Sequence, residues 1–216
     1  LSEVLDAEVL VPKKGDIKKI LDMTNLNAEI ISKESLEKIK RDDKIRLESI
    51  EDLKNMLGLK KLERIELFDN SHLFGTYYVG AMVVFRDFLP DKNEYRKYKI
   101  DANVKDDLSA MREVIYRRYY RALLEKSELP DLIIVDGGET QLNATKEVID
   151  SLNLNICVIG LKKNDKHKTS KLVLSNLEEV EIKNSNLFVY LYKMQEEVHR
   201  FAITYHRNIK NKGMLR

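Results

Sequence analysis

The sequence predicts an α/β protein with a mixed five-stranded sheet, in which three antiparallel strands precede β-α-β units. Three strand-like runs with short connections begin near residue 62, and a long helix-like stretch follows them. Two short apolar runs, LIIV and ICVIG, then enclose another helix-like stretch. Short connections favour antiparallel pairing, whereas a helical crossover joins parallel strands that are buried on both faces. We therefore expect helices to flank the sheet, with a further helical segment at the N-terminus.

The first 60 residues predict a charged flank. Residues 4–11 are typical of a strand that ends at Pro12, and the stretch from Asp16 up to the residue before Gly58 contains neither proline nor glycine, which favours helix. The charged run KRDDK at 40–44 interrupts the apolar stripe, so we expect a second helix to begin at Ser49 and to end at Gly58. The stripe contains Ile17, Ile20, Leu21, Thr24 and Ala28.

The pattern changes to strands at residue 62. The expected strands are LERIELF, TYYVGAMVVF and, after a turn around Pro90, NEYRKYKI. Asp106 and Asp107 open a long helix that ends before Pro130, and capping of that helix is their default role. The run LIIVD, a helix over 139–152 and the run ICVIG follow. A short strand or hairpin, KLVLSNLEEVEI, then precedes a helix over 185–209. The predicted domains are 1–60, 61–209 and a basic linker over 210–216.

This order of elements resembles the ribonuclease H-like fold, in which the first strand, the fourth strand and the last helix converge on a metal site. Asp69 ends the first of these strands, Asp136 ends the fourth and His199 lies on the last helix. Carboxylates at the ends of buried strands leave the sheet at fixed points, and their hard oxygen atoms favour Mg²⁺ or Mn²⁺. The three residues therefore indicate a metal-dependent phosphodiesterase site.

Each of the three residues also has a simpler interpretation. Asp69 and Asp136 are in positions typical of turn or helix caps, and Asp136 precedes Gly137-Gly138, which suits such a cap. His199 is one helical turn after Glu196, which is a suitable hydrogen-bond partner. The catalytic interpretation depends on the three residues meeting in the fold.

The charge balance places any nucleic-acid contact in local clusters, because the net charge is only +2. The candidate DNA-backbone contacts lie in LKKNDKHKTSK and in the last predicted helix; a solvated loop is the alternative for the first of these. Cys157 has no partner cysteine in the sequence, and the acidic N-terminal stretch and short apolar runs predict a cytoplasmic protein without membrane segments. The candidate contacts are Lys162, Lys163, Lys166, His167, Lys168, Arg200, His206 and Arg207.

Residues 62–209 also resemble a known family, the C-terminal endonuclease domain of UvrC from bacterial nucleotide excision repair. The resemblance lies in FDNSH at 68–72, DDLSAMREVIYRRY at 106–119, LPDLIIVDGGETQLNATKEV at 129–148, VIGLKKNDKHKTSKL at 158–172 and HRFAITYHR at 199–207. Thr140 and Asn70 depart from the usual family pattern beside the predicted site. No GIY-YIG nuclease pattern, cysteine-rich region or tandem helix-hairpin-helix module is recognisable in the sequence.

The resemblance implies an Asp-Asp-His site, formed here by Asp69, Asp136 and His199, that makes the incision 5′ of a lesion. It also implies Mg²⁺ or Mn²⁺ as cofactor, and damaged double-stranded DNA presented in a UvrB-DNA complex, with UvrA acting earlier. We expect the isolated domain to be monomeric. The alternatives are a non-catalytic nucleic-acid or protein-binding module, which would need no divalent ion, and a ribonuclease H or recombination-type nuclease, which would differ in substrate.

Overall fold

The computed structural model describes residues 11–73, 77–100, 104, 106–163 and 169–214, and the chain divides into two units, Leu1–Ile45 and Arg46–Arg216. Helix α2 (Asp16–Met56) runs through the boundary without a break, so the prediction of a second helix beginning at Ser49 was wrong. The KRDDK run consists of residues that a helix tolerates on its solvated surface, and it therefore does not interrupt the helix. The predicted strand at 4–11 falls almost wholly outside the described residues.

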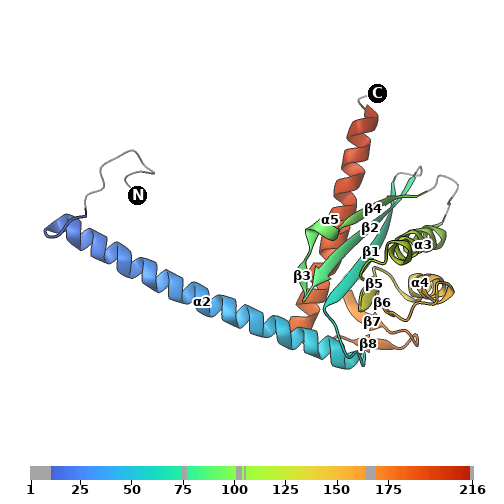
Figure 1. Cartoon of the computed structure of the whole chain (residues 1–216), viewed down its shortest axis with the longest axis horizontal. Helices are drawn as coiled ribbons and strands as arrows, with labels where there is room; N and C mark the ends of the chain where they lie inside the picture. Colours follow the sequence, from blue (N-terminus) through green and yellow to red (C-terminus); the bar gives the residue numbers. More distant parts are fainter. Residues whose placement is uncertain (1–10, 74–76, 101–103, 105, 164–168, 215–216) are drawn as a thin grey trace. The chain divides into compact units, whose positions relative to one another are not determined.

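The second unit is built on a mixed sheet, which confirms the predicted fold class (Figure 1). Strands β1, β5 and β6 pair in parallel, and the other pairs are antiparallel. The strand order is β3-β2-β1-β5-β6-β7-β8, with β4 beside β2. The sheet has eight strands rather than five because a short strand follows β2 and a hairpin follows β6. The strands are β1 (Arg64–Leu73), β2 (Tyr77–Arg86), β3 (Leu89–Pro90), β4 (Arg96–Lys99), β5 (Leu132–Val135), β6 (Cys157–Lys163), β7 (Thr169–Val173) and β8 (Glu179–Glu181).

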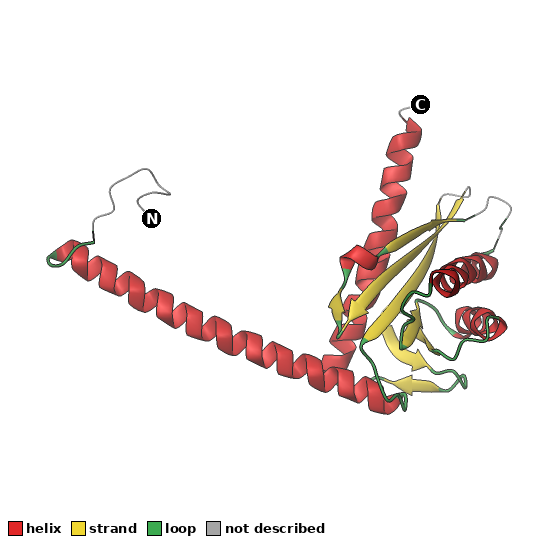
Figure 2. Cartoon of the chain, viewed as in Figure 1, coloured by secondary structure: helices red, strands yellow, loops and turns green. Residues whose placement is uncertain are grey.

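Helices cover both faces of the sheet (Figure 2). Helices α3 (Asp107–Glu125) and α4 (Glu139–Ser151) pack on one face, and α5 (Ser185–Met214) packs on the other. Asp106 is the N-cap of α3, and its side chain accepts a hydrogen bond from the Ser109 amide, so its predicted capping role is confirmed. Helix α5 continues five residues beyond the predicted end at Ile209. The alternation of β1 decides which of its side chains meets which helical layer.

A buried network of charges joins β1 to α3. The carboxylate of Glu66 is fully buried and accepts hydrogen bonds from Arg64 at 2.9 Å, Arg118 at 2.7 Å and the Tyr119 hydroxyl at 2.9 Å. The guanidinium of Arg64 also donates to Glu94 at 2.5 Å. A buried carboxylate is tolerated only when its oxygen atoms have such partners, and removal of one partner is strongly destabilising. The network thus fixes strand β1 against helix α3.

Acid should weaken this network through Glu94. The hydrogen bond from Arg64, together with one from Arg86, lowers the pKa of Glu94 to about 2 from its ordinary value of 4.5. The folded chain therefore binds fewer protons than the unfolded chain, and the contribution of Glu94 to stability is present above pH 4.5 and is lost as the pH falls toward 2. We expect Glu94→Gln to lower the free energy of unfolding at pH 7, with a difference from wild type that shrinks through this window.

The measurement is urea denaturation between pH 7 and pH 2, followed by circular dichroism. The control is Glu196→Gln, which removes an exposed carboxylate outside the network. A difference between Glu94→Gln and wild type that stays constant across the acid range would contradict the prediction.

Candidate functional site

Asp69 lies on the face of β1 that meets helix α5. Ile65 and Leu67, at alternate positions before it, belong to the core formed with α5, whereas Phe68 packs with α3 and α4 on the other face. Asp69 is almost fully buried, with 7% of its surface exposed. A carboxylate at this depth needs polar or cationic partners, and the facing helix supplies one.

Asp136 lies beside Asp69 because β1 and β5 pair in parallel. Phe68 is in register with Val135, and the backbone amide of Asp136 donates to the Phe68 carbonyl oxygen at 2.9 Å. Neighbouring strands are about 4.8 Å apart, so the two aspartates emerge from adjacent backbone positions. Helix α4 begins after the N-cap residue Gly138, which has no side chain to form a cap. The parallel pairing thus places the two aspartates at adjacent strand ends.

His199 reaches Asp69 from helix α5. Its Nδ1 atom is 3.3 Å from Oδ2 of Asp69, although 130 residues separate the two in sequence. The imidazole side chain is 51% exposed, and the Asp69 side chain is only 9% exposed. The pair therefore has a buried carboxylate anchored in the sheet and a ring that solvent or a substrate can reach. The predicted strand-to-helix convergence of these two residues is present in the structure.

Gln195 is a member of the site that sequence reasoning missed. Its side-chain amide donates to Oδ1 of Asp136 at 2.5 Å, and the residue is 2% exposed. Gln195 precedes His199 by four residues, so both lie on the same face of α5. That spacing was the available signal, and the amide type of the side chain gave no indication of a metal or catalytic role. One helical turn of α5 therefore contacts both aspartates.

The turn that follows Asp136 packs closely against the backbone of β6 at Gly160. A Cβ atom added at Gly160, on β6, would lie 2.6 Å from the carbonyl oxygen of Gly137. Only glycine permits this approach, because the obstacle is backbone and cannot rotate away. At Gly138 an added Cβ would meet nothing within 4 Å. The position of the β5–α4 turn thus depends on a missing side chain on the neighbouring strand.

The side-chain oxygen and nitrogen atoms of Asp69, Asp136 and His199 suit a divalent cation, but they do not surround a single point. Among the described residues, no group of three His, Cys, Asp or Glu side chains is spaced to hold an ion as the side chains stand. Asp69 and His199 form a pair, and Asp136 accepts a hydrogen bond from Gln195. Two carboxylates and one imidazole remain a donor set that Mg²⁺ or Mn²⁺ accepts.

The predicted nucleic-acid contacts are only partly described. Lys162 is exposed at the end of β6 and forms an ion pair with Glu179, which also pairs with Lys171 at 2.9 Å. Arg200 is exposed on α5 and donates two hydrogen bonds to Glu197. Lys166, His167 and Lys168 lie outside the described residues, and the side chains of Lys163, His206 and Arg207 are not described. Within the described ranges, every helix is too polar or too short to serve as a bilayer span.

Comparison with known proteins gives one family. A family model described as the UvrC RNAse H endonuclease domain matches residues 54–203. UvrABC system protein C of Streptococcus equi subsp. zooepidemicus is 44% identical over 217 residues, which cover 99% of this chain. The corresponding protein of Streptococcus uberis is 43% identical over 97% of the chain. The chain spans 36% of the length of each of these relatives.

Solved structures whose backbones partly resemble that of this chain include endonuclease V enzymes. Endonuclease V of Ciona intestinalis, in complex with DNA containing an inosine, is 10% identical, with a TM-score of 0.45, over 82% of this chain and 99% of that one. Human ENDOV is 11% identical, with a TM-score of 0.37, over 69% of this chain and 86% of that one.

Gln195 should act as a positioning residue for Asp136. We expect Gln195→Leu to weaken Mn²⁺ binding by about tenfold or more, because partners that orient a metal ligand typically contribute that much to affinity. The measurement is calorimetric titration of MnCl₂ into the chain, with Glu196→Gln as control, since that variant changes the neighbouring exposed residue. An unchanged affinity would contradict the prediction, and a stronger affinity would mean that the amide competes with the ion.

Proposed function

The chain belongs to the UvrC RNase H endonuclease domain family, and we propose that it is a metal-dependent DNA endonuclease that makes the 5′ incision in nucleotide excision repair. The observation that carries the proposal is the contact of His199 with Asp69 at 3.3 Å, beside the strand position that bears Asp136. Asp69 and His199, from distant segments, meet beside the strand end that bears Asp136. Turn capping does not require the histidine.

Asp69, Asp136 and His199 would hold the cation. Asp69 is the natural anchor, since its carboxylate is nearly buried and is fixed by a central strand. When bound, Mg²⁺ or Mn²⁺ would neutralise charge on the scissile phosphate and promote ionisation of the attacking water. Mn²⁺ suits the set because an imidazole is a softer donor than a carboxylate.

His199 has two candidate roles, and its contact with Asp69 suits both. The ring serves either as a metal ligand or as the group that transfers a proton, because imidazole exchanges protons near neutral pH. In both roles the contact of Nδ1 with Asp69 fixes the orientation of the ring. Its half exposure leaves it accessible to a phosphodiester. Gln195, one turn earlier, would keep the Asp136 carboxylate directed toward the same helix face.

The substrate in this proposal is damaged double-stranded DNA. The name of the relatives, UvrABC system protein C, supports delivery of that DNA in a UvrB-DNA complex, with UvrA acting earlier. Lys162 and Arg200 are exposed cations available for backbone contact, although each is already paired with a glutamate. Such contacts would position the strand without reading its sequence. Choice of the lesion would belong to the partners.

The decisive variant is Asp69→Asn, which keeps the size of the side chain but removes its charge. We expect it to abolish Mn²⁺ binding measured by calorimetry, and to reduce 5′ incision by the full-length protein at least about 100-fold, the scale of losing one preorganised electrostatic contact. The fold should persist by circular dichroism. Asp150→Asn is the matched control, because it makes the same change at an exposed position on α4.

Full incision by Asp69→Asn would refute the catalytic assignment. DNA binding by the wild-type chain with neither metal binding nor incision would favour a non-catalytic binding module. Preferential cutting of RNA-DNA hybrids would favour a ribonuclease H instead.

A further inference from the structure

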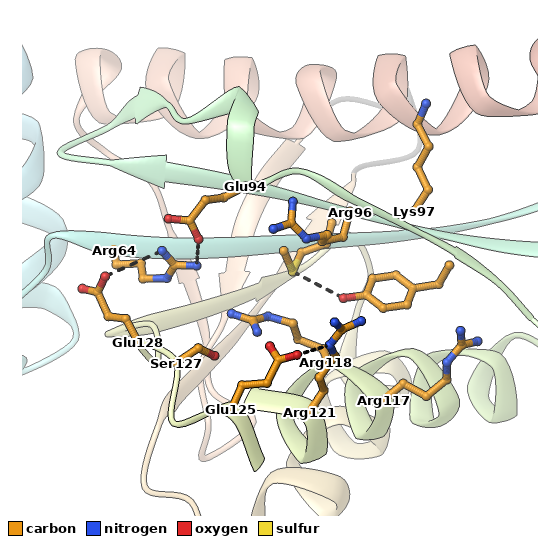
Figure 3. A pocket seen from close by; sticks show the side chains of 12 residues that line it. Arg64, Glu94, Arg96, Lys97, Arg117, Arg118, Arg121, Glu125, Ser127 and Glu128 are labelled. Carbon is orange, nitrogen blue, oxygen red and sulfur yellow. Dashed lines mark hydrogen bonds and ion pairs between the residues drawn. The ribbon is translucent and has the colours of Figure 1, made fainter. Parts of the chain in front are cut away.

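A pocket of roughly 460 Å³ lies between strand β4 and helix α3 (Figure 3), and neither Asp69 nor His199 lines it. Its floor includes Met82 and Tyr98, which belong to the core beneath α3 and α4. Figure 3 shows arginines of α3 on one side of the pocket and Arg96 of β4 on the other. The pocket is therefore on the sheet face opposite α5, at the edge formed by β4.

The lining carries a surplus of positive charge. Basic side chains outnumber acidic ones by six to three, and most of the basic ones are arginines. An arginine presents a planar fork of donors that matches the oxygen atoms of a phosphate or carboxylate. The basic residues are Arg64, Arg96, Lys97, Arg117, Arg118 and Arg121, and the acidic residues are Glu94, Glu125 and Glu128. The buried Glu66, which pairs with Arg64 and Arg118, offsets part of this surplus, and the exposed Arg96 and Arg121, the second of which also pairs with Glu125, are the cations that an anion can reach.

Two of these arginines have donors that the described carboxylates leave unsatisfied. Arg64 is 1% exposed, and its Nη1 atom has no hydrogen-bond partner among the described residues; the oxygen Oε2 of Glu128 is 3.8 Å away, beyond hydrogen-bond distance. Arg96 is exposed and donates only to backbone carbonyl oxygens, those of Asn93 and Tyr95. A buried donor without an acceptor costs free energy that a bound anion would recover.

The sheet register connects this pocket to the catalytic pair. Asp69 on β1 is opposite Ala81 on β2, and Ala81 is opposite Lys97 on β4. Residues in one such cross-strand row share a face, and two strand spacings amount to roughly 10 Å. The Lys97 ammonium group lies 4.6 Å from the ring centre of Phe201, two residues after His199 on α5. Lys97 thus extends the basic lining from the pocket onto the catalytic face (Figure 3).

We propose that this pocket binds a backbone phosphate of the DNA strand whose neighbouring part reaches Asp69 and His199, an inference that rests on the proposed nuclease function. A strand crossing the β4 edge passes from Arg96 and Arg121 to Lys97 and then to the catalytic row. Continuity with that row is what favours DNA over an acidic protein segment as the occupant. The phosphate sets the distance between the anchored position and the cleaved bond.

The test measures binding without cleavage. A fluorescein-labelled duplex with an unpaired bubble is titrated with the chain in EDTA, by fluorescence anisotropy, over a series of KCl concentrations. We expect Arg96→Gln and Arg121→Gln each to weaken binding about threefold to tenfold, and to lower the slope of log affinity against log salt by about one, as for the loss of one phosphate contact. Both residues are exposed, so neither variant disturbs the buried Glu66 network.

The matched control is Arg112→Gln. Arg112 lies on the same helix, is paired with Glu147 and is 42% exposed, but it does not line the pocket. The control should bind DNA as the wild type does. Overlapping curves for Arg96→Gln, Arg121→Gln and Arg112→Gln would overturn the proposal. Failure of the wild-type chain to bind the duplex at low salt would also overturn it.

Competition with the labelled duplex identifies which kind of anion the pocket binds. Inorganic phosphate, added at constant ionic strength, should displace the duplex only weakly. Phosphate binding that depends on Arg96 while duplex binding does not would overturn the DNA assignment in favour of free phosphate. Polyglutamate binding with the same selective dependence on Arg96 would overturn it in favour of an acidic protein.

The two proposals fail separately. Incision by Asp69→Asn tests the catalytic assignment, whereas duplex binding by Arg96→Gln is measured in EDTA and needs no metal. If Asp69→Asn still cut DNA while Arg96→Gln lost binding, the catalytic assignment would fail and the phosphate pocket would stand. If Asp69→Asn lost incision while Arg96→Gln bound normally, the pocket assignment alone would fail.

Discussion

The buried carboxylate of Glu66 is the interaction on which the arrangement of the second unit depends. It accepts hydrogen bonds from a neighbouring position on β1 and from two successive residues of α3. Because strand side chains alternate, this clamp lies on one face of β1, and Asp69, three residues later, lies on the other. A buried ion pair whose hydrogen bonds are all satisfied adds little net stability over apolar side chains in the same place. Few other arrangements of β1 and α3 would satisfy it, however. Its main effect is to determine the position of the strand.

The Asp69–His199 pair and the basic pocket lie on opposite faces of the sheet around β1. Asp69 belongs to the layer beneath α5, whereas Arg64 belongs to the layer beneath α3 and lines the pocket. The cross-strand row that ends at Lys97 joins the two at the sheet edge. Sites built on strands and helices hold their side chains more exactly than sites built on loops. A substrate that bridges both sites would therefore meet a nearly rigid surface.

Much of this arrangement was predictable, and the exceptions have physical causes. Strand-end positions and helical periodicity indicated Asp69, Asp136 and His199 as candidates, because those signals are local in sequence, and the structure shows the contact between Asp69 and His199. The partner of Asp136 was not predicted, because a glutamine on an amphipathic helix has many ordinary roles. Glu66 stands within the apolar run LERIELF, which indicates a buried charge but not its partners. The pocket was not predictable, since its lining comes from segments that only the tertiary fold brings together.

The order of the elements along the chain has a consequence for biosynthesis. The Asp69–His199 contact closes a loop of 130 residues, and α5 is the last element of the fold to leave the ribosome. A nascent chain that has emerged only as far as β8 contains both aspartates but neither His199 nor Gln195. The site therefore cannot assemble until α5 has been synthesised and has docked on the sheet. For the nuclease that we propose, activity would be coupled by this route to completion of the domain, and a product truncated before α5 would lack both His199 and Gln195.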